Sequence, residues 1–332
     1  MPDAQEKVPR EGWEAVAKRT WREAKADAVP DLAASLTYYG LLALFPGALV
    51  LVSLLGFLGQ ARTHSLLNTV GQIAPGGVHS FLNVVVHQVQ ARAGAAGLAA
   101  VAGILVALWS ASGYVAGFTR AANRIYDVDE GRPVWKTVRV RLLTTLALVV
   151  MLVLAAMIVL LTGPVAGQVG KALGIGHAAV LTWDIVKWPV LVLLVSVMVT
   201  LLYRATPNVK HGGSRWFSPG GLLAVLIWIV VSAVFAVYVS FSGSYNKTYG
   251  SFATAIVFLV WLWISNIAIL IGAEFNAELD RERAIRSGLP EDVEPFVEVR
   301  DTKTLDDAQR RRVDRANRFR RRTARRTAPR GR

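Results

Sequence analysis

The sequence predicts an all-α integral membrane protein, a single bundle of six transmembrane helices with both termini in the cytoplasm. Of its 332 residues 53% are hydrophobic, and several long apolar stretches contain no charge. Segments rich in Lys and Arg alternate with segments poor in them. The segments before span one, between spans two and three, between spans four and five, and after span six contain 6, 6, 3 and 17 Lys and Arg residues. The other three connecting segments contain 2, 1 and 1. Because basic segments stay in the cytoplasm, this alternation predicts the orientation.

The N-terminal arm, residues 1–35, is charged and mixed in sign and has no signal-peptide core. Trp13, Ala17 and Trp21 recur every four residues, so they share one face of a predicted helix. That helix either lies at the membrane surface before the first span or is solvated, and the pattern leaves both interpretations open.

Six spans follow within a transmembrane domain of residues 36–280. The clearest is 252–272, an uncharged run long enough to cross a bilayer, where the backbone must be helical. We expect Pro46 to kink or break the first span, and Gly113 and Gly117 to let another helix approach the second closely. The remaining spans are predicted at residues 36–58, 95–118, 142–161, 188–203 (extended into 180–187) and 222–239.

The connecting segments predicted on the outer side, residues 59–94, 162–180 and 240–251, contain no carboxylate. This mildly cationic face could contact anionic headgroups, or the short segments could simply carry few charges.

The C-terminal segment, residues 281–332, is predicted to be a largely disordered cytoplasmic tail. Residues 310–332 contain twelve Arg and one Asp, with little apolar content. Its expected partners are anionic lipid headgroups at the membrane, and no sequence-specific nucleic-acid contact is expected.

Several stretches, in this order and spacing, resemble the YihY/BrkB family of bacterial membrane proteins, historically labelled ribonuclease BN. The resemblance implies a six-helix protein of the bacterial inner membrane, tied to envelope integrity or serum resistance, with no settled activity. It covers about residues 33–280 and leaves out the arm and the tail. The stretches that carry it are SLTYYGLLALFP (35–46), LWSASG (108–113), ANRIY (122–126), RP (132–133), LYRATPN (202–208), PG (219–220), YNKTYGS (245–251) and GAEFNAEL (272–279).

No catalytic, cofactor-binding or metal-binding residue is predicted, so the chain is not expected to be an enzyme. It has no cysteine, and its five histidines are scattered without metal-ligand spacing. A glycine-rich phosphate loop and a nucleophile elbow are also missing from the sequence.

Polar residues gather instead at the inner ends of spans two, four and six. We hypothesise that Glu274 pairs with Arg120, Arg124 or Arg204 and closes the inner end of a cavity, because an ionised carboxylate at that depth needs a partner. Alternatively, the arginines extend to the headgroups. The predicted cluster is Arg120, Asn123, Arg124, Arg204, Asn208, Glu274, Asn276 and Glu278.

Polar side chains inside the spans either make interhelical hydrogen bonds or line a substrate path, and the main candidates are Ser110, Ser112, Ser265 and Asn266. At the outer interface, Asp184 and Lys187 either neutralise each other or form a gate. Two functions remain: a transporter or flippase-like protein for an anionic or amphipathic envelope molecule, and a scaffold that holds a second copy or envelope-assembly partners.

Overall fold

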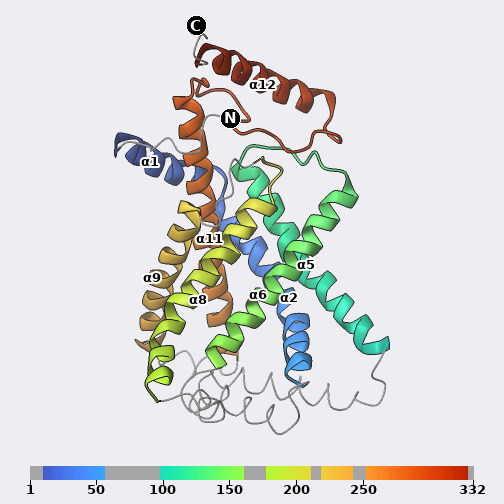
Figure 1. Cartoon of the computed structure of the whole chain (residues 1–332), viewed down its shortest axis with the longest axis vertical. Helices are drawn as coiled ribbons and strands as arrows, with labels where there is room; N and C mark the ends of the chain where they lie inside the picture. The colour runs from blue at the N-terminus through green and yellow to red at the C-terminus, as the bar shows by residue number, and fades with distance from the viewer. Residues whose placement is uncertain (1–9, 57–97, 161–176, 211–217, 242–251, 328–332) are drawn as a thin grey trace.

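The computed structural model describes residues 10–56, 98–160, 177–210, 218–241 and 252–327 (Figure 1). In these ranges the regular structure is α-helical, apart from one antiparallel bridge between Val209 and Val299. The helices are α1 (Arg10–Ala26), α2 (Val29–Gly56), α5 (Leu98–Ile125), α6 (Val134–Leu160), α8 (His177–Ala205), α9 (Pro219–Phe241), α11 (Phe252–Arg286) and α12 (Asp307–Thr327).

Each predicted span overlaps one long helix over its described residues, and the all-α class is confirmed. Four helices contain stretches long and apolar enough to cross a membrane, namely Val134–Val159, Leu181–Ala205, Pro219–Ser240 and Ala255–Arg286. In α2 and α5 part of the predicted span lies outside the residues whose side chains are described. Most of the predicted outer segments, 59–94, 162–180 and 240–251, also lie outside the described residues.

The first span was expected to kink or break at Pro46. Helix α2 is unbroken at this position and continues to Gly56, while the expected kink stays a prediction because the side chain of Pro46 lies outside the description. The last span was expected to end at Gly272, whereas α11 runs on to Arg286. The polar residues Glu274, Asn276 and Glu278 therefore lie within a helix.

Helix α11 is central to the bundle, since it contacts α9, α2, α1 and α5. Two glycine contacts bring helices close together. Gly220 of α9 faces Gly272 of α11, with each Cα beside the carbonyl oxygen of the other. On α5, Gly117 lies against Tyr39 of α2, and Gly113 lies farther from the same ring. The predicted close approach at Gly113 and Gly117 is thus made by α2.

Helix α1 packs one face on α11 and exposes the other. Val16, Thr20 and Ala24 are buried, whereas Trp13, Ala17 and Trp21 are exposed. The Trp13 ring also stacks on Phe275 of α11, with centroids 5.9 Å apart. The three residues do share a face, as predicted; Ala17 and Trp21 on it are exposed, and Trp13 is partly covered by Phe275.

The tail was predicted to be largely disordered, and for residues 307–327 this is wrong. They form α12, whose Val313 and Ala316 are buried in the core that includes Phe296 and Leu305. Arg320 donates hydrogen bonds to the carbonyls of residues 295 and 297. A short apolar stripe inside the arginine-rich sequence explains the helix, because residues 287–306 supply the surface that covers it.

Candidate functional site

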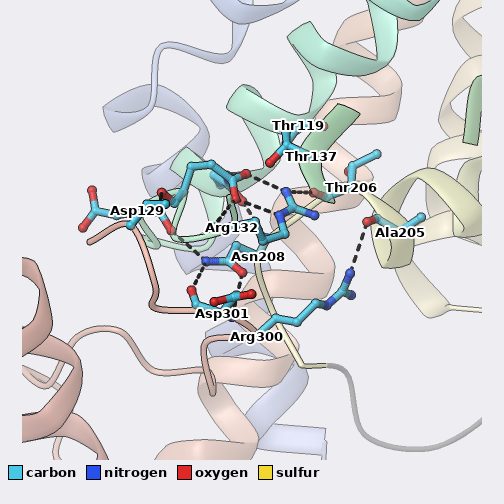
Figure 2. Close-up of polar contacts among 12 residues, drawn as sticks. Thr119, Asp129, Arg132, Thr137, Ala205, Thr206, Asn208, Arg300 and Asp301 are labelled. Carbon is cyan, nitrogen blue, oxygen red and sulfur yellow. Dashed lines mark hydrogen bonds and ion pairs between the residues drawn. The ribbon is translucent and has the colours of Figure 1, made fainter. Parts of the chain in front are cut away.

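A buried asparagine joins three segments at the α12 end of the bundle (Figure 2). Asn208, which follows α8, is 0% exposed. Its side-chain amide donates to the carbonyls of Asp129 (3.0 Å) and Asp301 (2.8 Å), and its Oδ1 accepts from the backbone N–H of Asp301 (3.0 Å). Its own backbone N–H donates to Oδ1 of Asn123 (2.8 Å). We call these residues, with Glu130 and Arg132, the Asn208 junction.

Arg132 fills the interior of this junction and is only 4% exposed. It donates to both carboxylate oxygens of Glu130 (2.7 and 2.6 Å) and to the carbonyl of Thr206 (2.7 Å). Burial alone would raise the pKa of Glu130, but the hydrogen bonds and charge of Arg132 and the amide of Asn123 bring it below its ordinary value. The pair therefore remains ionised and links the α5–α6 connection to the end of α8.

The segment after α11, residues 287–306, crosses the ends of these helices as a strap. Arg300 donates to the carbonyls of Arg204 (2.9 Å) and Ala205 (3.3 Å), which are left without helical partners where α8 ends. Lys136 of α6 forms an ion pair with Asp301 (2.6 Å). Asn123 and Asn208, both predicted site residues, thus serve to hold the strap on the bundle.

A second polar group surrounds Glu274 of α11, which is 1% exposed. The carboxyl group of Asp27, in the turn between α1 and α2, is among its charged neighbours, and Oε1 of Glu274 has no hydrogen-bond partner among the described atoms. Arg124, a predicted partner of Glu274, donates instead to Oδ1 of Asp27 (3.3 Å). No ion pair described in this part of the chain joins Arg124 to Glu274; Arg124 pairs with Asp27.

Asp27 was not identified from the sequence, where it is one of many charges in the N-terminal arm. Burial is the main cause that raises its pKa, and Arg124 opposes this effect. Two carboxylates can only accept hydrogen bonds and repel each other at short range, so a proton on either group would relieve the repulsion between Asp27 and Glu274.

The remaining predicted inner-end residues are dispersed over separate contacts. Glu278 accepts from Nε of Arg19 on α1 (2.8 Å) and forms an ion pair with Arg281 (3.2 Å). Asn276 accepts from the backbone N–H of Gly220 (2.9 Å) and thereby ties α11 to α9. The guanidinium of Arg120 lies over the ring of Tyr39, 5.3 Å from its centroid.

Polar side chains inside the bundle connect helices to one another. Asn266 accepts from the Tyr114 hydroxyl (2.8 Å) and donates to Thr37 (3.1 Å), so it joins α11 to α5 and α2. Ser265 accepts from Nε1 of Trp228 on α9 (3.0 Å). Ser110 donates to the Leu42 carbonyl of α2 (3.5 Å).

Ser112 accepts from Nε of Arg141 on α6 (2.6 Å). On α8, Lys187 is buried and donates to Asp184 (2.8 Å), so these two charges do neutralise each other locally.

Asp127, directly after α5, gives a pH-dependent prediction. Burial and then the charge of Glu294 raise its pKa to about 6, although Arg281 donates to it (3.0 Å). A raised pKa means that the contribution of Asp127 to stability is complete below its unfolded pKa of about 4 and is lost as the pH rises through about 6. Asp127→Asn should therefore raise the melting temperature of the purified protein at about pH 7.5.

The same substitution should have a smaller effect at about pH 5, where the native carboxyl is mostly protonated. Asp129→Asn removes a carboxylate from the same connection and controls for the change in net charge. An equal shift in melting temperature at both pH values would contradict the assignment to Asp127 ionisation.

Within the ranges that the structure describes, no group of three or more His, Cys, Asp or Glu is placed to hold a metal ion. The polar side chains described there mostly form hydrogen bonds and ion pairs that join one helix to another.

Comparisons with known proteins place the described geometry in context. The profile of a family described as Virulence factor BrkB matches residues 20–294. A ribonuclease-like protein of Bacillus subtilis strain 168, YfkH, is 33% identical over 257 residues, which are 76% of this chain and 90% of that protein. A UPF0761 membrane protein of Laribacter hongkongensis is 30% identical over 274 residues; these are 78% of this chain but 60% of the relative's length. No solved structure matches the chain significantly.

Proposed function

This chain belongs to the virulence factor BrkB family of membrane proteins. We propose that it is a transporter of the flippase type that moves an anionic, amphipathic envelope molecule. The proposal places it in the bacterial inner membrane with six crossings and both termini in the cytoplasm. The alternation of Lys and Arg supports this orientation, as does the location of α1 and α12 at one end of the bundle (Figure 1).

One observation carries the proposal: Glu274 is fully buried, and its neighbour is a second carboxyl group, Asp27. An ionisable group buried in a membrane protein is costly, and a static packing contact would be at least as stable with apolar residues. A carboxyl pair whose charge depends on a proton suits a protein whose helices change position, because loss of the proton would place two like charges side by side.

Glu274→Gln tests the proposal, because the amide keeps the shape and a donor for Asp27 but cannot ionise. The full chain would be reconstituted into liposomes with fluorescently labelled phosphatidylglycerol, and its movement between leaflets measured by quenching of outer-leaflet label. We expect the rate to fall at least about tenfold, which corresponds to roughly 1.4 kcal/mol on the barrier.

Glu282→Gln is the matched control. This carboxylate lies two turns further along α11, where it binds Arg19 and Arg286, and its removal should leave the rate within about twofold of wild type, well under 1 kcal/mol on the barrier. Wild-type chain that moves no lipid faster than empty liposomes would overturn the proposed transport of this lipid class.

A scaffold remains the second candidate, favoured by the interhelical bonds of Asn266 and Ser265, which occupy groups that could otherwise line a path. A scaffold should keep its function in Glu274→Gln, whereas the proposed transporter should lose it. The proposal assigns no catalytic step to this chain, so the ribonuclease-like name stays with the Bacillus subtilis relative.

A further inference from the structure

Helix α12 carries a row of three exposed arginines along one face. Arg311, Arg315 and Arg318 are spaced four and three residues apart, so they follow one another along a single side of the helix. None of the three takes part in an ion pair or hydrogen bond within the part of the chain that the structure describes. Arg312 and Arg320, by contrast, bind a glutamate and two carbonyls of the strap. We call Arg311, Arg315 and Arg318 the arginine row.

The arginine row faces away from the rest of the protein. Val313 and Ala316, on the opposite side of α12, are buried in the same core as Phe296 and Leu305 of the strap. Figure 1 shows α12 beyond the end of α11, with the strap between α12 and the bundle. The row therefore points away from the bundle and toward solvent.

This position also separates the row from the bilayer. The uncharged part of α11 ends at Gly272, and the helix continues to Arg286, which at 1.5 Å per residue is about 21 Å further. Headgroups extend only about 5–7 Å beyond the hydrocarbon on each side, and surface charges are screened beyond about 8 Å at physiological salt. The distance and direction of the row both disfavour the headgroups of the protein's own membrane as its partner.

An open groove adjoins the row, between α12 and the strap. Its volume is about 580 Å³, and it is lined by Thr302, Lys303, Arg310, Val313 and Asp314. Nη2 of Arg310 donates to the carbonyl of Lys303 (3.0 Å), and this bond fixes the guanidinium at the groove. Two cations against one carboxylate make the groove positive, so it extends the basic surface of the row.

We propose that the arginine row binds the sugar-phosphate backbone of a nucleic acid, independently of base sequence. Guanidinium groups match phosphate oxygens with paired N–H donors, and three of them in line fit an anion whose charges repeat along a chain. An acidic protein fits less well, because protein interfaces have an apolar core, and the large exposed apolar side chains of the described residues include none from α12. The cytoplasmic location rests on the orientation in the proposed function, but binding does not depend on transport.

The test uses the purified full chain in phosphatidylcholine nanodiscs and a fluorescently labelled single-stranded RNA of about 20 nucleotides, with binding followed by fluorescence anisotropy. Combining Arg311→Gln, Arg315→Gln and Arg318→Gln should weaken binding at least about tenfold at about 50 mM salt. The combination should also make the dependence of log Kd on log salt shallower by about 2, since each phosphate contact contributes about 0.7.

The matched control combines Lys18→Gln, Arg22→Gln and Lys25→Gln. These exposed side chains lie on α1, so this variant loses the same net charge at another place. It should bind the RNA within about twofold of wild type. An equal loss of binding in the two combined variants would indicate general surface charge and overturn the site, as would wild-type chain that does not bind the RNA.

Competition experiments distinguish the class of partner. Phosphatidylglycerol vesicles that displace the labelled RNA at the same phosphate concentration as unlabelled RNA would assign the row to a membrane surface and overturn the proposal. Polyglutamate that displaces it at the same charge concentration would assign the row to an acidic protein, with the same consequence. Arg315→Gln alone, which should make the salt dependence shallower by about 0.7, keeps the test decisive if the combined variant fails to fold.

Discussion

Replacing Gly272 by alanine should prevent α9 from packing on α11 and leave little folded protein. An added Cβ would lie 2.4 Å from the carbonyl oxygen of Gly220, 2.5 Å from the hydroxyl of Tyr203 and 2.6 Å from Cβ of Ala224. The backbone oxygen cannot move aside without moving the helix, so the helices must separate. Forced overpacking costs about 1–3 kcal/mol or more, a large part of a typical net stability of about 5–15 kcal/mol.

The measurement is the yield of monodisperse protein in detergent together with its melting temperature. Gly113→Ala is the matched control, since its Cβ would meet only the Tyr39 ring at an ordinary 3.5 Å. Gly220→Ala should be as damaging as Gly272→Ala, because its Cβ would lie 2.1 Å from the Gly272 oxygen. A Gly272→Ala protein that melts at the wild-type temperature would show that the helices are not this close.

Asn208→Asp should release the strap of residues 287–306 from the bundle. The substitution keeps the shape of the side chain but replaces its NH2 group, which donates two hydrogen bonds, with an oxygen that can only accept. The carbonyl oxygens of Asp129 and Asp301 therefore lose their donor. Each buried group left unsatisfied costs about 1–3 kcal/mol, and the new charge adds to this. We expect a loss of about 3 kcal/mol or more in the free energy of unfolding.

Limited proteolysis and hydrogen exchange of residues 287–306 measure this release directly. Asn317→Asp on α12 makes the same chemical change at a partly exposed site whose side chain accepts from Arg320 (2.8 Å), and it should leave the strap protected. Unchanged protection in Asn208→Asp would mean that the junction does not hold the strap.

Hydropathy and charge were sufficient to predict the long helices, because a membrane span must be apolar over its whole length. The positions of polar partners were not predictable in this way. Asn208 bonds to residues 85 and 93 positions away, and Asp27 reaches Glu274 from the opposite end of the chain. Arg141 was counted only as an orienting charge, and its contact with Ser112 depends on how α5 crosses α6.

The prediction for the tail was wrong because it relied on the arginine-rich composition and not on the spacing of the apolar residues. Twelve arginines predicted disorder, but Val313 and Ala316 share one face of α12 and need only the strap to cover them. The apolar stripe is present in the sequence, but the strap that covers it comes from another segment, so the helix depends on a tertiary contact that composition does not indicate.

Helix α1 has a mechanical consequence. The exposed Trp13 and Trp21 lie on one side of α1. On the other side, Arg19 forms ion pairs with Glu278 and Glu282, which are one turn apart on α11. These two ion pairs fix the 17-residue helix α1 on α11, so α1 cannot slide along α11 without breaking them. The exposed Trp21 is therefore held at a fixed position relative to α11, the longest helix described.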